Sequence, residues 1–476
     1  MSMTCYVLYT YMYMYMYTSA VVHVSENETI IEHLFVNDTN DGISLSGVFT
    51  SLTNVTSQFS SSHGIHVELR HDELRASEFS ASNNDADGIS IDSADQQSTS
   101  RVFHLDSCLV HSNAESGFKM TAAAAITVRN CVVHSNQLDA VTTDQRQGGS
   151  FRLEQSLVYE NQRSALQINS DGVYVDSCTI RDHHYGYWRL NRWSQRPLIR
   201  IKYGYQRPQD VILDISITNN ELVDNIADGI RVETGYYVYT ANLDFTNNTF
   251  ANSNRAMWVG GYYAHQYGLT WNINITNNRF LDNSETERSF MAIEDKDNIH
   301  VAMENNVFAN NTVLDLIVIS GLDGTFSGSG VVISANQFMS IVATNAIITM
   351  SNYHPLTLRS NVFESSTAPC YLQAPAFRSG VTHEIDARRN YWGLGDFADV
   401  MDRVCGFEKN MEHSLIHYIP YYTDRALTTL SPYLQDDIDI QGFIGGELTH
   451  DVVFSTAEFE SLIRITRSIF VRYEFS

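Results

Sequence analysis

Histidine, cysteine and serine side chains are the groups whose types and spacing could do chemistry in this chain. His183 and His184 are adjacent, and no third ligand lies at the spacing of a zinc site, so we expect them at the surface or in a turn. The six cysteines are spread along 476 residues without a Cys-x-x-Cys pair. No Ser/His/Asp or Cys/His set can be argued from residue order. The sequence therefore predicts no catalytic residues and no metal ligands.

One polar hexapeptide, Asn83-Asn84-Asp85-Ala86-Asp87-Gly88, is similar to the first half of an EF-hand calcium loop. The twelfth position of such a loop is glutamate, and here it is Ala94. Gly88 also belongs to a small-residue bend that recurs along the chain, as at Gly42 and Gly229. We therefore assign the hexapeptide to the fold and predict no cofactor.

A second short match concerns polysaccharide chemistry. Arg200-Ile201-Lys202 matches a tripeptide of the polygalacturonase family, but that family's Gly-His-Gly and paired-Asp motifs do not precede it in order. The tripeptide lies in a long insertion between Cys178 and Asn220, and Asp436-Asp437 falls beyond any groove of the main repeat. We interpret the match as chance. Three or more carboxylates converging with Arg or Lys in one groove would instead favour an enzyme.

Any functional site in this chain must be positioned by a scaffold that a repeated sequence builds. The phrase Ile275-Thr276-Asn277-Asn278-Arg279-Phe280 returns along the chain, with apolar residues three before and two after its second asparagine. Recurrence of one phrase at about 20–50 residues indicates a solenoid of stacked coils. Taking that asparagine as the anchor, the equivalent positions are His33, Asp72, Cys108, Cys131, Ser156, Cys178, Asn220, Asn248, Asn278, Asn306, Asn336, Asn361 and Asn390.

Short strand-forming runs between Gly, Asn and Asp turns predict an all-β right-handed parallel β-helix, a pectate-lyase-like solenoid of about 13 rungs. A leucine-rich repeat is disfavoured because its consensus is absent. In a β-helix, equivalent side chains stack. We expect an asparagine ladder through Asn220, Asn248, Asn278, Asn306, Asn336, Asn361 and Asn390, and an aromatic stack through Phe250, Phe280, Phe308, Phe338 and Phe363.

Composition changes divide the chain into four parts. Residues 1–20 carry no charge and alternate tyrosine and methionine from Tyr11 to Tyr17, and we interpret them as a low-complexity leader or an artefact of the gene model. Residues 21–385 form the predicted β-helix, and its insertion at 185–210 is either a binding loop or a packed hairpin. Residues 386–430 form a cap that contains Trp392, Gly393 and a short helix from Asp396 to Cys405. Residues 431–476 begin an incomplete second β module.

Charge and cysteine usage limit the partners and the compartment. A net charge of −25 argues against nucleic acid and against an anionic membrane surface. We expect Cys108, Cys131 and Cys178 to stack in the core as free thiols, and we hypothesise a disulfide between Cys370 and Cys405. Sequons that suit a secreted chain occur at Asn27, Asn37, Asn54, Asn247, Asn274 and Asn310.

The C-terminal motifs carry a resemblance to a known family. Asn-Asn-x-Phe rungs that close in Arg389-Asn390-Tyr391-Trp392-Gly393, followed by Asp402-Arg403-Val404 and His417-Tyr418-Ile419-Pro420, resemble the extracellular β-helix modules of the protein bark beetle (anakonda) family. Ile444-Gly445-Gly446-Glu447-Leu448 is similar to the start of that family's next module. The resemblance extends from about residue 21 to 454. It implies a large single-pass surface protein that organises epithelial contacts where three cells meet, without enzymatic activity.

The family's scavenger-receptor, lectin-like and transmembrane regions are missing here, so we expect a fragment whose membrane anchor lies elsewhere. We expect a non-enzymatic extracellular module of a cell-surface adhesion or junction scaffold, with protein or glycan ligands. It should bind no nucleic acid and should not contact the membrane itself. The alternatives are a carbohydrate-active β-helix enzyme, of lyase, hydrolase or epimerase type, and a sugar-binding rod that uses Trp188 and Trp193.

Overall fold

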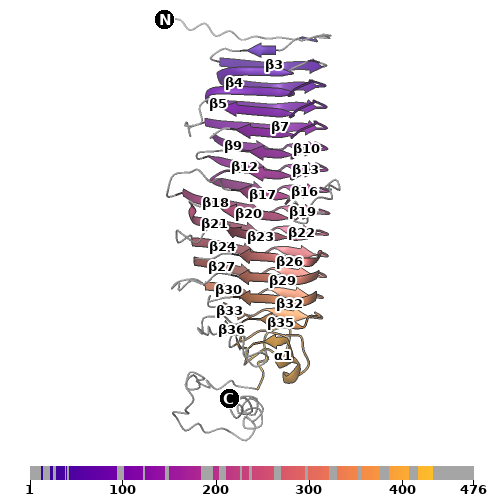
Figure 1. Cartoon of the computed structure of the whole chain (residues 1–476), viewed down its shortest axis with the longest axis vertical. Helices are drawn as coiled ribbons and strands as arrows, with labels where there is room; N and C mark the ends of the chain where they lie inside the picture. The colour runs from indigo at the N-terminus through magenta and orange to yellow at the C-terminus, as the bar shows by residue number, and fades with distance from the viewer. Residues whose placement is uncertain are drawn as a thin grey trace, which may run out of the picture.

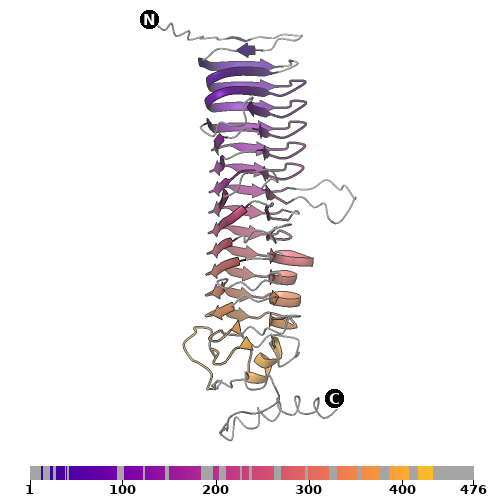
Figure 2. The ribbon, with the colours of Figure 1, turned by 60° about the vertical axis from the view of Figure 1, so that its left-hand side comes forward.

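Strands run side by side around one long axis, so that the chain forms a rod in this computed structural model (Figure 1, Figure 2). The fold is a right-handed parallel β-helix, as the repeat predicted. The structure describes residues 12–13, 22–24, 28–37, 39, 42–93, 101–121, 124–144, 149–183, 197–202, 211–225, 228–234, 238–261, 270–294, 298–320, 330–351, 356–375, 385–406 and 416–432.

Each coil contributes strands to three parallel stacks, while four long strands contribute to more than one: β3 (Glu28–Asn37), β4 (Ile43–Gln58), β5 (Ile65–Ser82) and β7 (Arg101–His111). The first stack contains β2 (Val22–Val24), β6 (Ile89–Ser93), β8 (Phe118–Thr121), β11 (Val141–Thr143), β14 (Leu166–Ile168), β17 (Ile199–Lys202), β20 (Ile230–Thr234), β23 (Met257–Gly261), β26 (Ser284–Glu294), β29 (Thr312–Ser320), β32 (Val342–Ser351), β35 (Cys370–Gln373) and β37 (Val404–Cys405).

The other two stacks complete the coil. The second stack contains β7 (Arg101–His111), β9 (Ala124–Arg129), β12 (Ser150–Glu154), β15 (Gly172–Asp176), β18 (Val211–Thr218), β21 (Val238–Thr246), β24 (Thr270–Thr276), β27 (Asn298–Glu304), β30 (Gly330–Ser334), β33 (Leu356–Arg359), β36 (Ile385–Asp386) and β38 (Ile416–His417). The third stack contains β1 (Met12–Tyr13), β3 (Glu28–Asn37), β10 (Val132–His134), β13 (Leu157–Tyr159), β16 (Thr179–Arg181), β19 (Glu221–Val223), β22 (Thr249–Ala251), β25 (Arg279–Leu281), β28 (Val307–Ala309), β31 (Gln337–Met339) and β34 (Val362–Glu364).

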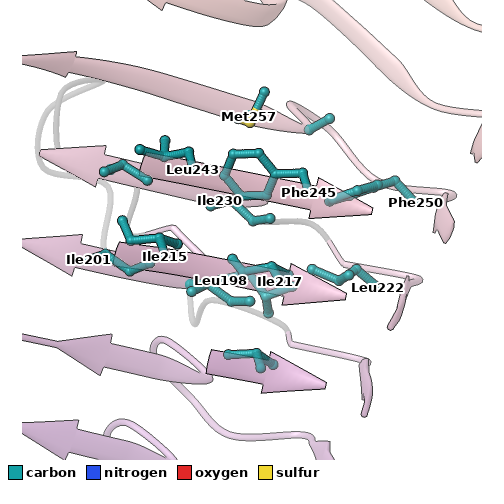
Figure 3. Packing of buried hydrophobic residues seen from close by; sticks show 14 of the residues in the cluster. Leu198, Ile201, Ile215, Ile217, Leu222, Ile230, Leu243, Phe245, Phe250 and Met257 are labelled. Atoms are coloured by element: carbon teal, nitrogen blue, oxygen red, sulfur yellow. The ribbon is translucent and has the colours of Figure 1, made fainter. Parts of the chain in front are cut away.

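The core fills the inside of the coil. Alternate residues of a strand point inward, so that Trp271, Ile273 and Ile275 of β24 are buried while Asn272 and Asn274 face outward. Figure 3 shows the same packing one coil earlier, where Ile215 of β18 lies beside Leu243 of β21. Burying such a side chain contributes roughly 1.5–3 kcal/mol, and the repetition of this pattern along the rod stabilises the fold.

Two sharp bends in each coil use a residue in the left-handed region. Asn219 (φ 58°) turns the chain from the second to the third stack, and Asp224 (φ 55°) turns it from the third toward the first. Asn and Asp tolerate this conformation better than most residues, which explains why the first asparagine of the repeated phrase recurs. The second asparagine has a different role.

That second asparagine forms the expected buried ladder. Asn278 donates from Nδ2 to Oδ1 of Asn306 at 3.0 Å, and its own Oδ1 accepts from Nδ2 of Asn248 at 3.0 Å. The aromatic stack is also confirmed, with ring centroids 4.6 Å apart between Phe280 and Phe308 and 4.7 Å between Phe338 and Phe363. Both columns are structural, because their members are buried in the rod.

The predicted register is wrong in the first coils. His33 is the left-handed bend residue (φ 55°), so the true anchor is Leu34, which pairs with Val55. Asp72 is not an anchor either, because Phe79 pairs with Cys108 at that position. The coil through Val55 was therefore missed. In these coils an apolar residue stands where later coils have the second asparagine. The alignment depended on the repeated asparagine phrase and therefore could not locate these coils.

The C-terminal cap closes the last coil. Helix α1 (Phe397–Arg403) begins at the predicted N-cap Asp396, whose side chain accepts from the backbone N–H of Asp399. The helix ends before the predicted Cys405, because Val404 and Cys405 extend as β37 and pair with β35. β38 then pairs with β36, with Ile416 opposite Ile385.

The ends of the chain are described only in part. In residues 1–20, β1 pairs with β3, with Met12 opposite Leu34. The remainder of that segment lies outside the described residues, and so do residues 433–476 with the predicted second module.

Candidate functional site

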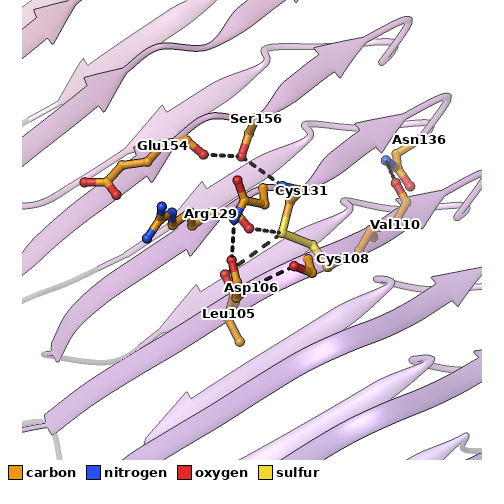
Figure 4. Close-up of a disulfide and its surroundings, with 11 residues drawn as sticks. Leu105, Asp106, Cys108, Val110, Arg129, Cys131, Asn136, Glu154 and Ser156 are labelled. Atoms are coloured by element: carbon orange, nitrogen blue, oxygen red, sulfur yellow. Dashed lines mark hydrogen bonds between the residues drawn. A yellow bond between two sulfur atoms is a disulfide. The ribbon is translucent and has the colours of Figure 1, made fainter.

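Two disulfides lie in the described chain. Cys370 and Cys405 are joined as predicted. Cys108 and Cys131 are also joined, which corrects the expectation of free thiols (Figure 4). They occupy the same position in consecutive coils, and their Cα atoms are 4.4 Å apart, which lies at the short end of the usual range for a disulfide. Cys178 is free and buried, and burial raises the pKa of its thiol to about 12, so it is a poor nucleophile.

The sequon asparagines differ in accessibility. The side chains of Asn54, Asn247, Asn274 and Asn310 are exposed. Asn37 is half-buried, and its amide oxygen is inaccessible to solvent. Asn27 lies outside the described residues. Four of the predicted attachment sites are therefore sterically open on the folded rod.

The tripeptide that matches polygalacturonases is part of a regular coil. Arg200 lies on β17 of the first stack, not in an insertion as expected, and its guanidinium donates to Glu233 at 2.9 Å. Arg231 also pairs with Glu233 and lies 4.9 Å above the ring of Trp258. The indole N–H of Trp258 donates to Glu294 at 3.0 Å. Together, these five side chains form a charged strip on the outer face of the first stack.

The neighbouring bend continues this strip. Arg288 binds both carboxylate oxygens of Asp228, at 2.7 and 3.0 Å, and one oxygen of Glu285 at 3.0 Å. Burial acts to lower the pKa of Arg288, but the two carboxylates outweigh it and raise the pKa above its ordinary value. Three carboxylates therefore lie close to arginines in the strip and this bend, namely Glu233, Asp228 and Glu285. Each of them already accepts hydrogen bonds from an arginine, so they are arranged as ion pairs.

Another polar cluster includes Asp87 of the calcium-like hexapeptide. Its side chain is only 1% exposed, and one oxygen lies 3.4 Å from Nδ1 of His63 and 3.6 Å from Nζ of Lys119. The other oxygen accepts from the backbone N–H of Ser116. Burial raises the pKa of Asp87 and lowers that of His63. A buried carboxyl beside a neutral imidazole could exchange protons.

The rest of the hexapeptide has a structural role. Asn84 belongs to a second buried ladder, in which its Nδ2 donates to Oδ1 of Asn113 at 2.8 Å. A side chain on Gly88 would meet the backbone oxygen of Gly117 at 2.9 Å, which confirms the small-residue bend. Within the described ranges, no three His, Cys, Asp or Glu side chains come together in a way that could hold a metal ion.

The expectation that His183 lies at the surface is wrong. It does follow a turn residue, Asp182, but its side chain is completely buried rather than at the surface. It occupies the second ladder where neighbouring coils have Asn161 and Asn225, and its backbone N–H donates to Oδ1 of Asn225 at 3.3 Å. His184, most of the 185–210 insertion with Trp188 and Trp193, and Asp436-Asp437 lie outside the described residues.

A shallow groove of about 760 Å³ runs across the outer face of the second stack. Its lining comes from six consecutive strands, β15, β18, β21, β24, β27 and β30. The lining residues are Tyr174, Asp214, Ile215, Ser216, Asn242, Leu243, Asp244, Asn272, Ile273, Asn274, His300, Val301, Ala302, Gly330 and Val332. This size falls within the range of small-ligand sites.

Side-chain amides order the groove floor. Nδ2 of Asn272 donates to Oδ1 of Asn242 at 2.8 Å, and Nδ2 of Asn242 donates to Asp214 at 2.7 Å. In the adjacent column, Nδ2 of Asn274 donates to Asp244 at 2.8 Å. Sequence reasoning missed this groove, because the residues that form each column lie in different coils and no short motif contains them.

Comparisons with known proteins support the fold alone. No curated protein and no solved structure matches the chain. None of the described helices is long and apolar enough to cross a membrane. One family model, described as a right handed beta helix region, matches residues 41–197, in agreement with the architecture of those coils.

Proposed function

We propose that this chain is a non-enzymatic extracellular β-helix module of a cell-surface adhesion or junction scaffold. The observation that carries the proposal is the cap motif at Asn390-Tyr391-Trp392-Gly393. Asn390 ends the buried ladder by accepting from Asn361 at 2.9 Å, and Trp392 stacks on Phe363 at 4.9 Å. Gly393 has φ 66°, and a side chain there would meet the backbone oxygen of Phe363 at 2.1 Å. The motif through which the chain resembles junction proteins is thus built into the fold.

The disulfides and sequons support an extracellular location. Disulfides persist in oxidising compartments and are rare in the reducing cytosol. The bond between Cys370 and Cys405 joins the last regular coils to the cap, and the one between Cys108 and Cys131 joins two consecutive coils. Four exposed sequon asparagines are compatible with passage through the secretory pathway.

The charged strip supports a structural role for its ionisable groups. Glu233 pairs with two arginines, and Asp228 and Glu285 share Arg288. A catalytic acid or base must exchange its proton near neutral pH. The oxygens of these carboxylates already accept hydrogen bonds from arginines, so they are poorly placed to exchange a proton with a substrate. The strip is better suited to holding neighbouring coils together than to bond cleavage.

A cell-aggregation assay tests the proposal. Suspension cells that display the full-length protein should aggregate, and mixing labelled expressing cells with non-expressing cells shows whether the partner is a second copy or another surface molecule. Cells that lack the protein are the control. Dispersed cells with the protein confirmed at their surface would contradict the adhesive role.

A carbohydrate-active enzyme is the second candidate, and the buried carboxyl of Asp87 beside His63 and Lys119 favours it. The purified protein would then cleave or modify acidic polysaccharides, and Asp87→Asn would abolish turnover. Asp85→Asn is the matched control, because Asp85 is the exposed carboxylate of the same hexapeptide. Absence of turnover by the unmodified protein removes this candidate.

A further inference from the structure

One sequon lies inside the groove of the second stack. Among the described sequon asparagines, Asn274 alone contributes to the groove lining. It sits on β24 with its side chain exposed, and Asn272 and Asp244 lie beside it on the same floor. Asn247 and Asn310 instead occupy left-handed bends outside the groove. A sugar attached to Asn274 would therefore begin within the groove itself.

The amide of Asn274 is compatible with modification in the folded rod. An asparagine Nδ2 carries two hydrogens, and one of them donates to Asp244 at 2.8 Å. N-glycosylation replaces the other hydrogen, so the bond to Asp244 can persist. The hydroxyl of Thr276, the third sequon residue, donates to Oδ1 of Asn274. The modified side chain would thus keep both contacts that orient it.

The groove chemistry suits a neutral sugar chain. Most of the accessible lining is apolar and can contact the C–H faces of sugar rings. Nδ2 of Asn242 and Nδ2 of Asn272 each donate one hydrogen within the floor, which leaves the second hydrogen of each amide for sugar hydroxyls. The ring of Tyr174 lines one end, and the guanidinium of Arg152 lies 4.7 Å from its centroid. The described lining residues include two aspartates and no Lys or Arg, so an anionic sugar would be repelled.

We propose that the groove is an intramolecular binding site for the neutral N-glycan carried on Asn274. This inference rests on the extracellular location in the proposed function. Attachment to the groove floor gives the sugar a high effective concentration there, so that weak hydrogen bonds suffice to hold it. A glycan held against the floor is shielded from trimming enzymes and stays of the oligomannose type. Glycans on the exposed bends at Asn54, Asn247 and Asn310 are processed further.

Site-specific glycopeptide mass spectrometry of the full-length protein, secreted or displayed by animal cells, tests the proposal. The expected result is an occupied Asn274 that carries mainly oligomannose, next to processed glycans at Asn247 and Asn310. The double variant Asn242→Ala and Asn272→Ala removes two floor amides, and the oligomannose share at Asn274 should then fall to that at Asn247. Thr127→Ala on β9 is the matched control, because Thr127 is an outward residue of the same stack beyond the groove.

A second measurement does not depend on the variants. Endoglycosidase should release the Asn274 glycan slowly from the folded protein and rapidly after denaturation. An unoccupied Asn274 beside occupied Asn247 and Asn310, or an Asn274 glycan as processed as theirs, overturns the binding site alone. A chain without any N-glycan overturns the extracellular function together with the inference, so the two failures are distinguishable.

Discussion

The asparagines of the repeated phrase show how many hydrogen bonds one side chain can contribute to the stability of this rod. Asn278 is fully buried, and Oδ1 accepts from the backbone N–H and from Nδ2 of Asn248 at 2.9 and 3.0 Å. Nδ2 donates to the backbone oxygen of Phe245 at 2.7 Å as well as to Asn306. Four hydrogen bonds thus converge on one amide, whereas its neighbour Asn277 supplies only the left-handed bend.

Replacing these two neighbours should have unequal effects. Asn278→Ala leaves buried donors and acceptors without partners on three sides, so we expect the free energy of unfolding to fall by about 2–4 kcal/mol. Asn277→Gly keeps the positive φ and should change it by less than about 1 kcal/mol. Denaturant unfolding of both variants measures the difference, and equal losses would mean that the ladder does not stabilise the rod.

His183 should make stability depend on pH. Burial lowers its pKa to about 4, below the ordinary 6.5, so the unfolded chain binds a proton more readily than the folded chain between these values. The folding stability that depends on a neutral His183 is fully present above pH 6.5 and is lost as pH falls toward 4. The loss amounts to about 3 kcal/mol.

Substitution by the residue of the neighbouring coils tests this account. His183→Asn should complete the ladder between Asn161 and Asn225 and should remove this part of the acid sensitivity. Comparing denaturant unfolding at pH 7 and pH 4.5 measures the effect. His104→Asn, at an exposed position of β7, is the control. An unchanged pH dependence in His183→Asn would contradict the assignment.

At the scale of elements, the sequence predicted the coils where the asparagine phrase is intact. It failed at Leu34, Val55 and Phe79, because apolar anchors fill the same inward position without an amide. Cys108 and Cys131 were aligned correctly, but alignment cannot distinguish stacked thiols from a bond. The distinction depends on the separation between consecutive coils, which only the structure gives.

The groove and the Asp87 cluster could not be predicted for a different reason. Asp214, Asn242 and Asn272 become neighbours only when the register of β18, β21 and β24 is known. Asp87 approaches Lys119 of the next coil in the same way. A periodic sequence pattern reveals the residues that point into the core. It does not reveal outward sites, because their residues come from different coils of unequal length.

The disulfide at the cap should contribute measurably to stability. Cys370 and Cys405 close a loop with a sequence separation of 35, for which the chain-entropy relation gives about 3–4 kcal/mol. The double variant Cys370→Ser and Cys405→Ser should therefore unfold at lower denaturant concentration or temperature. As the control, both proteins are unfolded in a reducing agent, where the unmodified protein should lose its extra stability over the double variant. Equal stability under oxidising conditions would contradict the bond.

At the scale of the whole molecule, a parallel rod must protect its last coil. Trp392 is buried and stacks on Phe363, and α1 packs against β35 and β37 with Val400 buried. Removing such a cap exposes apolar surface and unpaired strand edges, which promote association between rods. The net charge of −25 opposes this association along the sides of the rod.

Trp392→Ala should therefore cause self-association in addition to a stability loss of about 3–5 kcal/mol. Light scattering after size-exclusion chromatography measures the association. Tyr391→Ala is the matched control, because Tyr391 belongs to the same motif but is only half-buried. A monomeric Trp392→Ala protein would show that the cap does not protect the end of the rod.

The location of the protein in an epithelial sheet tests the central claim most directly. The full-length protein, tagged and expressed at its natural level, should lie at the cell surface and concentrate at contacts, most strongly where three cells meet. Antibody added to unpermeabilised cells should reach the tag. A uniformly cytosolic signal that appears only after permeabilisation would contradict the extracellular adhesion function.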